Sequence, residues 1–128
     1  MKLDRLTPML EVDDLTATIA FYTDVLGFEV LATWPPDGAP GWAHLGCGDA
    51  HVMFSGRHSH GPGEEDHQHG GELPGALYCY APDIDALYTE LSSHTELEPP
   101  RVTDYQMKEI SIRDPNGFLL IFGQTPPS

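Results

Sequence analysis

Three polar side chains alternate with isoleucines late in the sequence, in a pattern that can bind a small polar molecule. Glu109, Ser111 and Arg113 alternate with Ile110 and Ile112, and a period of two is typical of a strand with one buried face. A carboxylate, a hydroxyl and a guanidinium on the other face can orient a polar ligand, and the carboxylate can accept a proton. The alternative is a solvated ion pair between Glu109 and Arg113 at a sheet edge.

Two histidines lie in segments that also have the composition of strands. If Leu45 faces a layer of helices, alternation turns Trp42 and His44 to the opposite face, and a cavity-facing Met53 would bring His51 with it. A histidine on such a face can act as a general base or bind a ligand. The alternative is a hydrogen-bonded histidine on a half-exposed strand.

Tyr78 and Tyr80 share a strand face with Ala76. Together with Trp42 they can line a pocket with aromatic surface, which suits a planar or cationic ligand through stacking and cation–π contacts. Ordinary core packing or a subunit contact is the alternative for either tyrosine.

A further group of histidines occupies a polar, glycine-rich stretch at 56–74, which we expect to be a long exposed loop. Its two His-x-His pairs can bind zinc, copper or nickel, or the stretch can cover a cavity as a lid. The alternative is a purely solvating role. The histidines concerned are His58, His60, His67 and His69.

Charge and composition exclude several classes of protein. The chain has 128 residues, with 6 basic and 20 acidic side chains and a formal net charge of −14. So few basic residues cannot form a nucleic-acid-binding patch. The apolar runs are too short to span a membrane and the N-terminus does not resemble a signal peptide, so we expect a cytoplasmic protein. We expect Cys47 and Cys79 to be reduced core residues.

The elements that must position these side chains follow one order twice. The first half predicts strands at 6–12, 28–34, 42–47 and 51–55, with a helix from the Asp13-Asp14 cap to Gly27. The second half predicts strands at 75–81, 101–103, 107–113 and 118–122, with a helix capped by Asp83. Each half therefore reads strand–helix–strand–strand–strand.

This repetition predicts an α+β fold of two tandem βαβββ modules whose curved mixed sheets surround a concave cavity. We expect one domain over 1–128, with module one at 1–56, the histidine-rich loop at 57–74 and module two at 75–128.

Three stretches of the sequence resemble the vicinal oxygen chelate superfamily, which includes glyoxalase I, bleomycin-resistance proteins and extradiol dioxygenases. They are Leu10–Leu15 with the later Leu26-Gly27-Phe28, Gly75–Tyr78 leading into Asp83–Leu87, and Ile112–Phe118 around an Asp-Pro-Asn-Gly turn. The resemblance implies the paired βαβββ modules and a homodimer. Because this scaffold carries many chemistries, it leaves the reaction open.

The resemblance also implies four positions for ligands to a divalent metal, which fall on Thr7, Met53, Ala76 and Ile121. Thr7, Ala76 and Ile121 are poor metal ligands, and the Met53 thioether suits only soft metals. We therefore expect no metal cofactor and a similarity in character to the metal-free bleomycin-resistance branch.

These observations predict a protein that captures a hydrophobic or cationic aromatic ligand without metal. The alternative is a metal-dependent lyase, isomerase or dioxygenase with a displaced site drawn from His44, His51 and Glu109, in which a divalent metal would act as a Lewis acid. The expected ligand-binding residues are Trp42, His44, His51, Met53, Tyr78, Tyr80, Glu109, Ser111 and Arg113.

Overall fold

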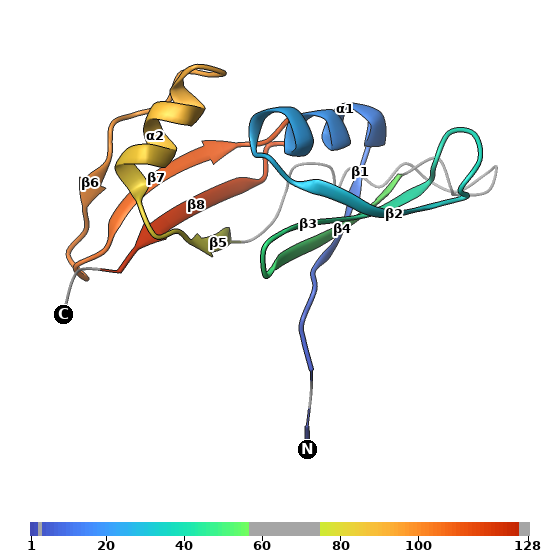
Figure 1. The fold of residues 1–128 in the computed structure, drawn as a ribbon, viewed down its shortest axis with the longest axis horizontal. Coiled ribbons are helices and arrows are strands. Elements are labelled where there is room, and N and C mark those ends of the chain that lie inside the picture. The colour runs from blue at the N-terminus through green and yellow to red at the C-terminus, as the bar shows by residue number, and fades with distance from the viewer. Residues whose placement is uncertain (3, 57–74, 126–128) are drawn as a thin grey trace. The chain divides into compact units, whose positions relative to one another are not determined.

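The computed structural model describes residues 1–2, 4–56 and 75–125 (Figure 1). The chain divides into two compact units, Met1–Gly71 and Glu72–Ser128. Their boundary falls inside the segment expected to separate the two modules. No helix in the described ranges is both long and apolar enough to span a membrane.

The first unit is a four-stranded mixed sheet with one helical segment. Its strands have the order β1-β4-β3-β2, with β1 and β4 parallel and the other neighbours antiparallel. The elements in chain order are β1 (Met9–Val12), α1 (Leu15–Ala20), a π-helical segment (Phe21–Val25), β2 (Glu29–Trp34), β3 (Trp42–Cys47) and β4 (Ala50–Gly56).

The second unit repeats this topology. Its strands have the order β5-β8-β7-β6, again with one parallel pair, between β5 and β8. The elements are β5 (Leu77–Tyr80), α2 (Ile84–Ser92), β6 (Arg101–Val102), β7 (Lys108–Arg113) and β8 (Leu119–Gln124). The predicted α+β fold of two tandem βαβββ modules is confirmed, and neither sheet is closed into a barrel.

The helix of the first unit covers one face of its sheet. Tyr22 is fully buried, with its ring centroid 4.8 Å from that of Phe54 on β4. Leu45 is also fully buried, so the neighbouring side chains of β3 emerge on the opposite face, as alternation requires. That face carries Trp42 and His44, which are half-buried. We call it the open face of the first sheet.

Both predicted helix caps are present. The Asp14 carboxylate accepts a hydrogen bond of 3.0 Å from the Ala17 N–H, and Asp83 accepts one of 3.1 Å from Ala86. The first helix nevertheless differs from the single α-helix expected up to Gly27. Its second half is π-helical, with Leu26 bonded to the Phe21 carbonyl five residues back. Apolar spacing alone does not report this change of winding.

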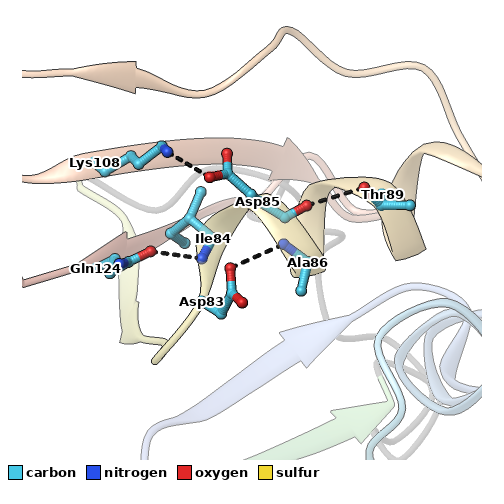
Figure 2. A network of polar contacts seen from close by, with 7 residues as sticks. All are labelled: Asp83, Ile84, Asp85, Ala86, Thr89, Lys108 and Gln124. Atoms are coloured by element: carbon cyan, nitrogen blue, oxygen red, sulfur yellow. Dashed lines mark hydrogen bonds and ion pairs between the residues drawn. The ribbon is translucent and has the colours of Figure 1, made fainter.

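Helix α2 is fastened to its sheet by polar contacts at its first turn (Figure 2). The Lys108 ammonium group on β7 donates to Asp85 at 2.6 Å. The Ile84 N–H donates to the side-chain oxygen of Gln124 on β8 at 2.8 Å. Together with the buried Ile84 and Leu91 side chains, these contacts hold α2 on one face of the second sheet.

Some boundaries and environments differ from the sequence predictions. The first strand begins at Met9 and not at Leu6, because Pro8 has no N–H to donate and only its carbonyl pairs, with the Met53 N–H. Cys47 is exposed and Cys79 is half-exposed, so the expectation that both are core residues was wrong. Cys47 is the last residue of β3 and directly precedes the exposed hairpin turn.

Candidate ligand-binding site

A buried carboxylate with two tyrosine partners is the centre of the polar cluster in the second unit. Glu109 on β7 is only 8% exposed. Its Oε2 atom accepts a hydrogen bond of 2.7 Å from the Tyr78 hydroxyl and one of 2.6 Å from the Tyr105 hydroxyl. Such charge-assisted bonds compensate a carboxylate for the water that it loses.

Gly123 on β8 allows Tyr78 to reach this carboxylate. Tyr78 lies on β5 and Glu109 on β7, with β8 between them, and Gly123 is the register partner of Glu109. A methyl group at Gly123 would overlap the Tyr78 phenol. Because Gly123 has no side chain, the Tyr78 phenol can pass over β8 to reach Glu109.

Both phenols are held in the protonated form. Burial, followed by the hydrogen bond to Glu109 and its negative charge, raises the pKa of Tyr78 to about 12. The hydrogen bond to Glu109 is the main cause that raises the pKa of Tyr105. Since neither phenol ionises near neutral pH, both remain donors to the carboxylate.

Exposed aromatic rings lie near the Glu109 carboxylate. Tyr80 is 76% exposed, and its ring centroid lies 5.3 Å from that of Tyr78 in an edge-on arrangement. Tyr105 is 63% exposed. We call Tyr78, Tyr80, Tyr105 and Glu109 the tyrosine–carboxylate cluster. It offers ring faces next to a fixed negative charge.

A cavity of about 220 Å³ adjoins this cluster. Ser111 contributes to its wall, and Arg101, which is the register partner of Glu109, adds a positive charge. The lining residues are Glu98, Pro99, Arg101, Glu109, Ile110, Ser111, Leu119 and Ile121. The cavity is therefore mixed in character, with both signs of charge and two aliphatic side chains from β8.

Arg113 lies away from the carboxylate that was expected beside it. Its guanidinium donates to the Gly117 carbonyl at 2.7 Å, at the turn that joins β7 to β8. Arg113 follows Glu109 by four residues, or roughly 13 Å along an extended chain. The predicted polar face thus divides into Glu109 and Ser111 at the cavity and Arg113 at the turn.

A second polar cluster lies on the open face of the first sheet. His44 Nε2 and His51 Nδ1 are 2.8 Å apart, and the Arg5 guanidinium lies 3.3 Å from His51 Nε2. Burial, then the neighbouring His51 and Arg5, lowers the pKa of His44. The Trp42 ring lies 6.4 Å from that of His44, and Met53 is the register partner of His44 on β4. The structure therefore has Trp42, His44, His51 and Met53 on one face of the sheet, as the alternation of strand side chains predicted.

The residues at the implied metal positions do not fit a divalent metal. Thr7 and Ala76 lie outside the strands, just before β1 and β5, while Met53 and Ile121 lie on β4 and β8. One thioether, one hydroxyl and two aliphatic side chains are not a donor set for a hard or borderline divalent ion. Within 1–2, 4–56 and 75–125, no group of three or more His, Cys, Asp or Glu side chains is arranged to hold a metal. His58, His60, His67 and His69 lie outside the described residues.

Two functional candidates were missed in the sequence. Tyr105 projects from a tight turn before β7, in which Gln106 has a φ of 70° and its N–H bonds to the Thr103 carbonyl. Its only sequence signal is its position four residues before Glu109. Arg5 precedes the first strand, where no periodicity applies.

The comparisons with known proteins identify the family of this fold. A family model described as the Glyoxalase/Bleomycin resistance protein/Dioxygenase superfamily matches residues 2–122. A comparison with curated protein sequences gave no match.

Solved structures share the fold over nearly the whole chain. The antibiotic-binding protein TnmS3 from a Streptomyces species is 21% identical, with a TM-score of 0.73 over 98% of this chain and 99% of its own. A lactoylglutathione lyase from Agrobacterium tumefaciens is 24% identical, with a TM-score of 0.71 over 97% and 95%. A bleomycin resistance determinant encoded on the transposon Tn5 is 24% identical, with a TM-score of 0.64 over 98% and 100%. At these identities the likeness concerns the fold. With the family model covering almost all of the sequence, the chain belongs to the glyoxalase/bleomycin resistance protein/dioxygenase superfamily.

Proposed function

We propose that this protein captures small aromatic cations, without metal chemistry, at the tyrosine–carboxylate cluster of its second unit. The observation that carries the proposal is the Glu109 carboxylate, which is 8% exposed and is fixed by two phenols on the same oxygen. Stoichiometric capture lowers the concentration of free ligand and needs no bond to be made or broken.

The chemistry of the cluster suits a cation better than a neutral ligand. Tyrosine ring faces attract a cation through their quadrupole, by about 0.5–2 kcal/mol for each well-placed ring. Both hydrogen bonds fall on Oε2, and in this proposal the second carboxylate oxygen of Glu109 attracts the cationic group of the ligand. The formal net charge of −14 also raises the local concentration of cations.

The solved relatives support capture as a role for this fold. TnmS3 is described as an antibiotic-binding protein, and the Tn5 protein as a bleomycin resistance determinant. The proposed preference for aromatic cations is inferred from Glu109 and the tyrosines of this chain and not from these relatives.

A pair of fluorescent probes tests the preference for cations. We would titrate the protein with 10-methylacridinium, and with neutral acridine at mildly alkaline pH. Glu109→Gln keeps the shape and the acceptor oxygen but removes the charge. We expect it to weaken binding of the cation about tenfold, equivalent to about 1.4 kcal/mol, and to leave neutral acridine unaffected.

Two further variants provide the controls. Glu90→Gln removes an exposed carboxylate from α2 and should bind the cation like the wild type. Tyr80→Leu removes the most exposed ring of the cluster and should weaken binding of the cation. Equal affinity for both probes, or an unchanged Glu109→Gln variant, would reject the proposal.

A metal-dependent lyase, isomerase or dioxygenase is the second candidate. The observation in its favour is the pair His44 and His51, whose ring nitrogens face each other at 2.8 Å. Glu109, the third member of the displaced site considered from the sequence, lies in the other unit and already accepts two phenols. About one divalent metal ion per chain after purification without chelators, retained on dialysis, would favour this candidate over capture.

We also propose that the protein is a homodimer. β2 is an edge strand with exposed apolar side chains, since Val30, Leu31 and Trp34 are 44%, 48% and 67% exposed. Such an edge favours association with another chain. Light scattering coupled to gel filtration should give twice the mass of one chain, and a monomer mass would exclude a stable dimer.

A further inference from the structure

Sulfur and nitrogen donors form one continuous row across the open face of the first sheet. Met9 on β1 is the register partner of Met53 on β4, and Met53 is in turn the partner of His44 on β3. Register partners on neighbouring strands present their side chains on the same face, with Cα atoms about 4.5–5.5 Å apart. The row therefore reads thioether, thioether, imidazole over three adjacent strands.

A second imidazole completes the group from the same face. His51 lies two residues before Met53 on β4, so alternation gives it the same orientation. His44 Nε2 and His51 Nδ1 are 2.8 Å apart. One of these nitrogens therefore donates a hydrogen bond to the other, which holds the two rings side by side on this face.

The strands that carry these donors are fixed relative to one another. The Met53 N–H donates to the Pro8 carbonyl at 2.8 Å, which ties the start of β1 to β4. Fully buried Phe54 and Leu45 hold β4 and β3 from the opposite face. Rigid strands position a site more accurately than loops do, while the unbranched methionine side chains can adjust their sulfur atoms.

The donor set selects the kind of metal. Two thioethers and two imidazoles form a soft site, which suits Cu(I) and is unsuited to the oxygen-seeking ions Mg²⁺ and Ca²⁺. Zn²⁺ prefers thiolate, imidazole and carboxylate ligands. The Arg5 guanidinium, 3.3 Å from His51 Nε2, repels a divalent ion about twice as strongly as a monovalent one. The soft donor atoms and the nearby positive charge of Arg5 therefore both favour Cu(I).

We propose that Met9, Met53, His44 and His51 form a binding site for one Cu(I) ion on the open face of the first sheet. Met53 is the only one of these residues at a position that the family resemblance gave to a metal ligand. The site lies in the first unit and the tyrosine–carboxylate cluster lies in the second. The Cu(I) site and the proposed capture function can therefore be tested independently.

The four methionines of the chain provide a direct test. They are Met1, Met9, Met53 and Met107, and Met107 lies beside β7 in the second unit. We would label all methionine methyl groups with ¹³C and add Ag(I), a diamagnetic stand-in for Cu(I), to the full chain. Methionine-to-leucine variants assign each methyl signal.

Competing thiols and histidines must be removed before this titration. Cys47→Ser and Cys79→Ala eliminate the two cysteine thiols, neither of which is in a disulfide. Asparagine at His58, His60, His67 and His69 eliminates the other histidine cluster. Thermal unfolding of this variant checks that the fold is retained.

One equivalent of Ag(I) should shift the methyl signals of Met9 and Met53 and leave that of Met107 in place. Competition with a chromogenic Cu(I) chelator should give one ion per chain. Met53→Leu and His44→Gln should each weaken Cu(I) binding by at least about tenfold, the loss that even outer-shell partners cause. The matched variants Met107→Leu and His94→Gln should not change it.

Two results would overturn the site. One is an Ag(I) titration that shifts Met107 as much as Met9 and Met53, or shifts none of them. The other is a Cu(I) affinity that is the same in Met53→Leu, His44→Gln and their matched controls. Both results would leave the acridinium experiment, and with it the proposed capture function, untouched.

Discussion

At the level of single residues, Gly123 decides whether the Tyr78 phenol can reach Glu109. The phenol crosses β8 at this position, and a methyl group there would overlap it. We predict that Gly123→Ala destabilises the protein by about 1–3 kcal/mol, the usual cost of overpacking a tight site. Urea unfolding followed by circular dichroism would measure the change.

Two other variants test the reason for that loss. Gly41→Ala adds a methyl group that meets nothing closer than 4.0 Å and should be almost neutral. Tyr78→Ala removes the obstructed ring, so the double variant should lose less stability than the sum of the two single losses. Strict additivity would mean that Gly123 acts through something other than Tyr78.

The pH dependence of Tyr78 follows from the same contact. Its pKa is raised from 10.0 to about 12, so the folded state holds this proton more tightly than the unfolded chain. The stability that this provides is complete below about pH 10 and is lost as the pH rises through about 12. Tyrosinate absorbance should show a late component near pH 12 that Tyr78→Phe abolishes.

Glu109→Gln should move this late component to lower pH. Burial is the largest cause of the raised pKa of Tyr78, and the hydrogen bond to Glu109 and its charge follow. In Glu109→Gln, burial should therefore still keep the pKa of Tyr78 partly raised. An unchanged titration in Glu109→Gln would assign the whole effect to burial.

The sequence identified some of these residues better than others. Glu109 and Ser111 could be found because alternation with Ile110 and Ile112 sets their face. Tyr105 could not, since its place depends on a turn with positive φ at Gln106. Alternation likewise predicts that Arg113 lies on the same face as Glu109. It does not predict the hydrogen bond from the Arg113 guanidinium to the Gly117 carbonyl.

Among the elements, α2 allows a comparison of two adjacent acidic residues. Asp83 caps the helix through the Ala86 N–H, and Asp85 pairs with Lys108 at the surface. We predict that Asp83→Ala costs about 1 kcal/mol, as lost N-caps do. Asp85→Asn should cost less, because exposed ion pairs contribute only about 0–1 kcal/mol.

Urea unfolding with and without added salt separates the two cases. Salt should reduce the small effect of Asp85→Asn, since it screens exposed charges, and should leave that of Asp83→Ala largely unchanged. If Asp85→Asn were the more damaging variant, the ion pair with Lys108 would stabilise α2 more than the cap does.

Strands and helix starts were predictable because their signals are local. Within the described residues, strand-forming composition, alternating hydrophobicity and the two aspartate caps located the strands and helices to within a few residues. The π-helical segment at Phe21–Val25 was missed, since one extra residue in a turn barely changes apolar spacing. The pairing of β1 with β4 was not predicted, because the register between strands far apart in the sequence is a tertiary property.

For the molecule as a whole, the net charge of −14 should make cation capture dependent on salt. Raising the ionic strength from about 0.01 to 0.15 M shortens the Debye length from about 30 to 8 Å. We predict a several-fold loss of affinity for 10-methylacridinium over this range and little change for acridine. If both probes responded equally, long-range attraction would play no part in binding.

The order of the strands also bears on how the chain folds as it is synthesised. In each sheet the strand made last, β4 or β8, lies between the first strand and the third. A nascent chain therefore cannot close a sheet until that strand has left the ribosome, and until then β1 or β5 lacks its neighbour. Since β4 precedes the whole second unit, the first sheet can close while the second is still being translated. A ribosome that stalls after β7 would leave β5 and β7 without the strand that joins them, and such unpaired edges are what chaperones bind.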